Sequence, residues 1–215
     1  MKNTLMEIYQ KLYQTYGPRH WWPAETPFEV MVGAILTQNT SWVNVEKAIQ
    51  RLKDKKVLTT NGIHGLSQPR LASLIRPSGT YRIKAARLKA FASFLFKEYS
   101  GDLKKMKRRK LLELREELLG VNGIGPETAD SILLYGLQKP IFVVDAYTRR
   151  ILSRHGIVSE KTSYEGIQNL FMNHLHHDER LYNEYHALIV HLGKNVCKKR
   201  PECDRCPIKE IKCLK

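Results

Sequence analysis

An all-α fold is predicted for this chain by three observations: apolar residues at helical spacing, capping signals where segments begin, and no convincing alternation of apolar and polar residues. Near the start, apolar residues recur three or four positions apart, at Leu5, Ile8, Leu12 and Tyr16. Gly17-Pro18 follows and interrupts the periodic run. We therefore expect an amphipathic first helix that ends near Tyr16.

The next helix begins at a capping box. In Thr26-Pro27-Phe28-Glu29 the Thr26 hydroxyl can accept a hydrogen bond from the N–H of Glu29, and proline suits the first helical position. The segment continues to Gln38 and is apolar almost all round, so we expect it to be buried. Further amphipathic segments follow at 41–52, 67–75, 82–99 and 110–119.

Composition and charge limit the possible functions. The 215 residues include 36 Lys and Arg against 21 Asp and Glu, which gives a formal charge of +15, and 42% of them are hydrophobic. No run approaches the roughly 20 consecutive apolar residues of a membrane-spanning helix, and the first residues lack a secretory signal pattern. We expect a cytoplasmic protein, nucleoid-associated in a prokaryote, with a polyanionic partner and no membrane. The basic run at 104–110 fits either a solvated surface or part of a DNA contact.

The stretch 118–129, LLGVNGIGPETA, contains a candidate DNA-binding turn. A leucine-rich helix ends, Gly123-Ile124-Gly125 turns, and a new helix opens at Pro126. Glycines allow positive φ and a close approach of backbone to another molecule, and the N–H groups at a helix start suit a phosphate. An ordinary helix-turn-helix has similar features. The flanking leucines and the Thr-Ala pair make the stretch resemble the helix-hairpin-helix motif more specifically.

A single carboxylate follows an apolar segment. Residues 141–144, IFVV, lead directly to Asp145, and the next helix runs through 149–152. Taken alone, this placement favours Asp145 as the N-cap of that helix over a catalytic role.

All four cysteines lie in the last 19 residues, at Cys197, Cys203, Cys206 and Cys213. In an intracellular chain such clustering favours a metal site over a disulfide framework. The spacing C-x5-C-x2-C-x6-C suits either an iron–sulfur cluster or zinc.

Taken together, the hairpin, the Val144-Asp145 pair and the cysteine tail resemble the endonuclease III superfamily of DNA base-excision glycosylases over nearly the whole chain. The resemblance implies that Asp145 is the catalytic carboxylate and that Gly123 and Gly125 contact DNA. It also implies a helical barrel at 19–139 and a second helical domain formed by 1–18 and 140–215. The expected partner is double-stranded DNA with damaged bases, and we expect a monomer.

The same resemblance implies a [4Fe–4S] cluster on the four cysteines, with zinc as the alternative. The family's spacing is C-x6-C-x2-C-x5-C, so the central C-x2-C of this chain agrees while each outer spacer differs by one residue. We expect the cluster to have a structural role.

Glu127 departs from the pattern of family members that also cleave the DNA backbone. Those members have a lysine at this place in the hairpin, and its amine forms a Schiff base with the sugar. A carboxylate cannot form an imine, so the sequence predicts a monofunctional glycosylase without lyase activity. Glu127 is equally explained as an acid in the first turn of a helix, and we assign it a weak role in the base pocket.

The tryptophans point to the substrate. Trp21-Trp22-Pro23 and Trp42 resemble the 3-methyladenine DNA glycosylase branch, in which the matching positions border the base pocket. Tryptophans are commonly core residues, but a flipped base is bound by stacking between aromatic side chains. A 3-alkylated purine is cationic, so an aromatic cage attracts it through cation–π contacts.

The sequence leaves open which residue fills the gap in the DNA and which base is the substrate. Either Gln38 or Asn39 is expected to fill the gap left by the extruded base, although Asn39 also fits a plain turn. The alternative functions are a thymine or uracil mismatch glycosylase, an endonuclease III-type glycosylase/lyase for oxidised pyrimidines, and a non-catalytic module that binds damage.

Overall fold

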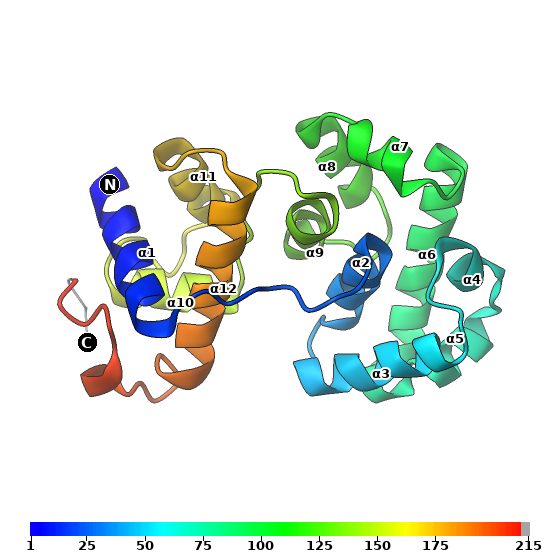
Figure 1. Ribbon diagram of the computed structural model, residues 1–215, viewed down its shortest axis with the longest axis horizontal. Helices are drawn as coiled ribbons and strands as arrows, with labels where there is room; N and C mark the ends of the chain where they lie inside the picture. Colours follow the sequence, from blue (N-terminus) through cyan, green and yellow to red (C-terminus); the bar gives the residue numbers. More distant parts are fainter. Residues whose placement is uncertain (212–215) are drawn as a thin grey trace. The chain divides into compact units, whose positions relative to one another are not determined.

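The computed structural model describes residues 1–211, and Figure 1 shows its arrangement of helices. The predicted all-α class is confirmed, because the described residues contain helices and turns but no strand. The chain folds into two compact units, one formed by Met1–Pro23 and Lys139–Lys215 and the other by Ala24–Gln138. These limits differ slightly from the predicted 19–139 barrel. The N–H of Arg19 donates to Glu184 Oε1 over 2.6 Å, which ties this segment to the unit of the two chain ends.

The unit of the two chain ends consists of four α-helices and a short 3₁₀ helix among its described residues: α1 (Lys2–Tyr16), α10 (Ala146–Arg154), α11 (Tyr164–His174), α12 (Glu179–Asn195) and η3 (Cys203–Arg205). The first helix ends at Tyr16, as the sequence predicts. It packs against α12 (Figure 1). The Tyr185 hydroxyl of α12 donates to the Leu5 carbonyl of α1 over 2.7 Å. Phe142 and Phe171 stack in the interior with ring centroids 3.7 Å apart.

The central unit consists of the following elements: α2 (Pro27–Leu36), α3 (Trp42–Asp54), α4 (Thr60–Gly65), α5 (Gln68–Leu74), η1 (Arg76–Ser78), α6 (Tyr81–Tyr99), α7 (Leu103–Arg108), α8 (Leu111–Leu119), α9 (Pro126–Ser131) and the π-helical turn η2 (Ile132–Gly136). As predicted, α2 is the core helix, and Phe28 to Leu36 are all buried. It contacts α3, α6, α9 and η2. It ends two residues before the predicted Gln38. The short α4 and α7 were not predicted, because six-residue helices carry little periodic signal.

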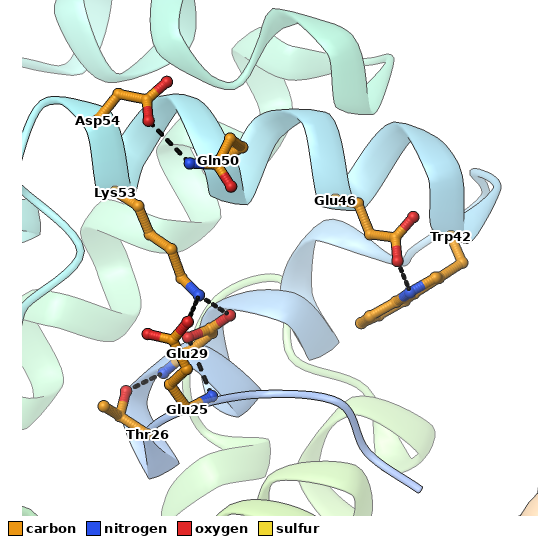
Figure 2. Close-up of polar contacts among 8 residues, drawn as sticks. All are labelled: Glu25, Thr26, Glu29, Trp42, Glu46, Gln50, Lys53 and Asp54. Atoms are coloured by element: carbon orange, nitrogen blue, oxygen red, sulfur yellow. Dashed lines mark hydrogen bonds and ion pairs between the residues drawn. The ribbon is translucent and has the colours of Figure 1, made fainter.

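The predicted capping box at the start of α2 is present. The Thr26 hydroxyl accepts from the N–H of Glu29 over 3.1 Å, with Pro27 at the first helical position. The buried Glu29 carboxylate accepts from the N–H of Glu25 and pairs with Lys53 Nζ at 2.8 Å (Figure 2). The box therefore fixes the start of α2 against α3, which carries Lys53.

The basic run at 104–110 covers most of α7 and is exposed except for Met106. Arg109 pairs with Glu117, and Lys107 donates to Gln138. Within residues 1–211, no helix is both long and apolar enough to cross a bilayer.

Candidate active site

The predicted hairpin joins α8 and α9. Gly123 adopts φ +85°, and a Cβ there would lie 2.2 Å from Cγ of Arg87. Both the conformation and the close contact therefore require glycine. Gly125 is the N-cap of α9 and is exposed, and a Cβ on it would meet no atom within 4 Å. The backbone at Gly125 is thus open to another molecule.

A buried ion pair holds the two helices of the hairpin together. Asp130 on α9 is fully buried, and its carboxylate accepts from Nε and Nη2 of Arg115 on α8 over 2.7 and 3.1 Å. Sequence reasoning missed this pair, because neither residue stands out from the many charged residues of the chain.

Gln38 is anchored to the hairpin. Its amide nitrogen donates to the Gly123 carbonyl over 3.0 Å and to the Thr128 hydroxyl over 2.9 Å, while its amide oxygen accepts from Arg87. The neighbouring Asn39 is exposed, with φ +52°. Among the two candidates for the gap left by an extruded base, Asn39 is thus the side chain not committed to the hairpin by these bonds.

Asp145 is the N-cap of α10 and lies in the unit of the chain ends. Its Oδ1 accepts from the backbone N–H and the hydroxyl of Thr148 over 2.7 and 2.8 Å. Its Oδ2 lies 3.7 Å from Nε2 of His186 on α12, and the two side chains are only 12% and 7% exposed. The N-cap reading of the sequence is therefore correct for Oδ1, while Oδ2 faces an imidazole that the sequence did not indicate.

These contacts decide the charge of Asp145. Burial by itself raises the pKa of the carboxyl, but the neighbouring His186 side chain and the hydrogen bonds from the backbone N–H and hydroxyl of Thr148 lower it by more. The net result is a pKa below the ordinary value, so the buried group is a carboxylate at neutral pH.

The segment that leads to Asp145 is fixed by two side chains of α11. Gln168 Nε2 donates to the Phe142 carbonyl over 2.7 Å, and the Val144 N–H donates to the Tyr164 hydroxyl over 3.3 Å. These contacts satisfy backbone groups of a buried extended segment. They hold in place the backbone that directly precedes Asp145.

The predicted aromatic residues fall in both units. Trp21, Trp22 and the exposed Pro23 belong to the unit of the chain ends, and the two indole rings lie 5.5 Å apart. Lys194 Nζ lies 5.8 Å from the ring centroid of Trp21, so this ring already has a cation of the protein beside it.

Trp42 begins α3 in the central unit and is half-buried. Its indole N–H donates to Glu46 Oε1 over 2.8 Å, one helical turn further along (Figure 2). The carboxylate places negative charge next to the ring. Glu127 lies exposed in the first turn of α9, in the same unit.

Three of the four predicted metal ligands line one cavity of about 1040 Å³: Cys197, Cys203 and Cys206. Arg154 Nη1 donates to Cys197 Sγ over 3.2 Å. The fourth, Cys213, lies outside the described residues. Within residues 1–211, no three His, Cys, Asp or Glu side chains are arranged to hold a metal ion.

The sequence has clear relatives. Residues 32–176, more than half of the chain, match the HhH-GPD superfamily of base excision DNA repair proteins. A protein of Methanocaldococcus jannaschii, provisionally named a DNA repair glycosylase, is 50% identical over 211 residues, covering 98% of this chain and 96% of the relative. An endonuclease III of Thermotoga maritima is 31% identical over 188 residues, covering 85% of this chain and 81% of the relative.

Solved structures share the fold. The 3-methyladenine DNA glycosylase of H. pylori bound to 1,N6-ethenoadenine superposes with a TM-score of 0.76 at 29% identity, covering 90% of this chain and 96% of that one. A trapped endonuclease III–DNA covalent intermediate gives a TM-score of 0.83 at 22% identity, covering 98% and 95% of the two chains, which shows a common fold. By sequence and by its all-α, endonuclease III-like fold, the chain belongs to the HhH-GPD superfamily of base excision DNA repair proteins.

Proposed function

We propose that this chain is a monofunctional DNA glycosylase that hydrolyses the N-glycosidic bond of alkylated purines, of the 3-methyladenine type, and leaves an abasic site. The observation that carries the proposal is Asp145, a buried carboxylate with a lowered pKa and fixed hydrogen bonds. Cleavage of an N-glycosidic bond develops positive charge on the sugar, and a fixed anion stabilises that charge. The same carboxylate can orient the attacking water or accept its proton.

The absence of lyase activity is proposed from the residue in the hairpin. Glu127 occupies the place of the lysine that backbone-cleaving relatives use, and a carboxylate forms no Schiff base. Lys84 on α6 has a lowered pKa, but its amine is buried and donates to the Leu36 and Ser78 carbonyls. That amine is therefore enclosed and is not available to attack a sugar.

The preference for a cationic base is proposed from Trp42 and Glu46. An electron-rich indole attracts a cation lying over its face by about 1–2 kcal/mol, and the Glu46 carboxylate adds negative potential at the same ring. Similarity to the 3-methyladenine DNA glycosylase of H. pylori supports the same assignment.

An excision assay tests the proposal. The purified chain is incubated with duplexes that contain alkylated purines, uracil or thymine mismatches, or oxidised pyrimidines, and the released bases are identified by chromatography. Release of 3-methyladenine is expected, with no covalent protein–DNA complex after borohydride treatment. Release of uracil or thymine alone would instead identify a mismatch glycosylase, and a trapped covalent complex would identify a lyase.

Asp145→Asn separates catalysis from binding. This variant should bind damaged duplex as the wild type does while losing excision, because it keeps the side-chain shape and removes the charge. Asp54→Asn, an exposed change on α3, is the matched control and should remain active. A wild-type protein that binds damage but releases no base from any duplex would favour the non-catalytic module.

We also propose that Cys197, Cys203, Cys206 and Cys213 hold a [4Fe–4S] cluster. The three described thiols line one cavity, and the Arg154 guanidinium donates to Cys197 Sγ at its edge. When bound, the cluster would supply a rigid link between the four cysteines. Iron and acid-labile sulfide in a brown preparation are expected, whereas one zinc per chain in a colourless preparation would exclude the cluster.

A further inference from the structure

A basic cavity lies in the central unit, away from the residues assigned above. It has a volume of about 610 Å³ and lies between α5, η1 and the start of α6. We define the basic cavity by its polar lining residues, which are Gln68, Ser73, Arg76, Tyr81 and Arg82. Each of them has a side-chain hydrogen-bond donor, and none is acidic.

The positive charge of the basic cavity is not compensated. Arg76 and Arg82 are exposed, and within residues 1–211 no ion pair or side-chain hydrogen bond involves either guanidinium. The contact found for them is with an aromatic ring, since Cζ of Arg82 lies 5.9 Å from the ring centroid of Tyr81. Neither α5 nor η1 contains an acidic residue, and α6 has its single glutamate near its far end. Two guanidinium groups that line one cavity without a carboxylate favour the binding of an anion between them.

Contacts within the unit connect the basic cavity to the hairpin. The turn between η1 and α6 passes Gly79, and a Cβ on Gly79 would lie 4.0 Å from the Thr40 hydroxyl. Thr40 belongs to the turn after α2, whose Gln38 donates to the Gly123 carbonyl. Lys84 binds the carbonyls of both Leu36 and Ser78, and so holds the two turns together.

We propose that the basic cavity binds a backbone phosphate of the substrate DNA, as a second phosphate contact in addition to the hairpin. The proposal rests on the proposed function, since it assigns a further contact to the same substrate. A guanidinium matches the geometry of a phosphate and can donate two hydrogen bonds to it. The hydroxyl and amide donors of the lining suit the remaining phosphate oxygens.

The test uses the double variant Arg76→Gln/Arg82→Gln and undamaged duplex DNA. Affinity is measured by fluorescence anisotropy over a series of salt concentrations. Loss of one phosphate contact should reduce the slope of log affinity against log salt by about one, and weaken binding about tenfold at low salt.

A matched control removes equal charge from other positions of the same unit. Arg70→Gln/Lys97→Gln changes exposed residues of α5 and α6 that do not line the basic cavity. An equal loss in both double variants would overturn the proposal in favour of a general electrostatic effect. Circular dichroism of each variant establishes that its fold is intact.

A second experiment distinguishes a DNA phosphate from free phosphate as the occupant of the basic cavity. Inorganic phosphate is titrated calorimetrically into the wild type and into Arg76→Gln/Arg82→Gln. Site-dependent binding of inorganic phosphate, together with an unchanged salt slope for DNA, would show that the cavity takes the free anion and would overturn the proposal. Because binding to undamaged DNA needs no excision, failure of this inference is distinguishable from failure of the proposed function.

Discussion

Asp145 Oδ2 and His186 Nε2 lie 3.7 Å apart, and both side chains are nearly inaccessible to solvent. The imidazole is among the groups that keep the pKa of Asp145 low despite burial. Under the proposed function, His186 would act on the reaction through Asp145, as a positioning residue.

Replacement of His186 should therefore shift the acidic side of the pH–rate profile of excision. In His186→Phe the pKa of Asp145 rises, because burial persists while one stabilising partner is lost. Excision should then be lost at a higher pH than in the wild type, as measured by single-turnover rates from pH 4 to 8. His176→Phe, an exposed change, should leave the profile unmoved. Coincident profiles for His186→Phe and wild type would contradict the role given to His186.

The buried pair in the hairpin should contribute strongly to stability. Arg115→Met leaves the Asp130 carboxylate buried without its bidentate partner, which costs about 3–5 kcal/mol. Urea denaturation followed by circular dichroism measures the change. Arg109→Met breaks the more exposed pair with Glu117 and should cost far less stability, because an ion pair that is open to solvent contributes little. Similar losses of unfolding free energy in both variants would show that burial of the Arg115–Asp130 pair does not increase its contribution to stability.

Gln38 and Asn39 should behave differently when replaced by alanine. Gln38→Ala removes the bonds to Gly123 and Thr128 and should lower the melting temperature by about 2–8 °C, from roughly 1 kcal/mol per lost hydrogen bond. Asn39→Ala should lower the melting temperature only slightly, through the strain of alanine at φ +52°. It should slow excision, because Asn39 is the candidate for the gap left by the extruded base that is not bonded to the hairpin. Calorimetry and single-turnover excision check the two effects. Slower excision in Gln38→Ala with full thermal stability would reverse the assignment.

Lys84 should make stability depend on pH. Burial, with a smaller contribution from Arg87, lowers its pKa to about 8 in the folded chain, against about 10.4 for an unfolded lysine. Between these values the unfolded chain binds more protons, so the free energy of unfolding rises with pH from 8 to 10.4. Below pH 8 both states are protonated and the slope disappears.

The comparison with Lys84→Met isolates this effect. The stability of the wild type relative to this variant, from urea denaturation at several pH values, should increase across the same window. For Lys97→Met, at an exposed position of α6, the curve of stability against pH should run parallel to that of the wild type. If the stability–pH curves of Lys84→Met and the wild type are parallel, the lowered pKa of Lys84 is contradicted.

Glu46 should contribute to the choice of base. Glu46→Gln keeps a hydrogen-bond acceptor for the Trp42 indole and removes the negative charge beside it. Release of cationic 3-methyladenine should fall several-fold, while release of a neutral base such as 1,N6-ethenoadenine should change little. Competition assays on duplexes carrying either base measure the ratio. An unchanged ratio would remove Glu46 from substrate selection.

The sequence by itself determined the features that depend on neighbours within about one helical turn. The Thr26–Glu29 cap, the buried α2, the glycine at position 123 and the capping role of Asp145 follow from residue type and spacing. Each is a local interaction, so the order of residues is sufficient to specify it.

Only the tertiary structure decided the pairings between distant segments. It placed His186 against Asp145, Arg115 against Asp130, and Lys84 against the ends of α2 and η1. It also bonded Gln38 to the hairpin, which separated it from Asn39. The physical reason is that a charged or polar side chain far from its partner in sequence looks like any surface residue. Packing removes it from water, and its partner is then whichever group the fold brings within hydrogen-bonding distance.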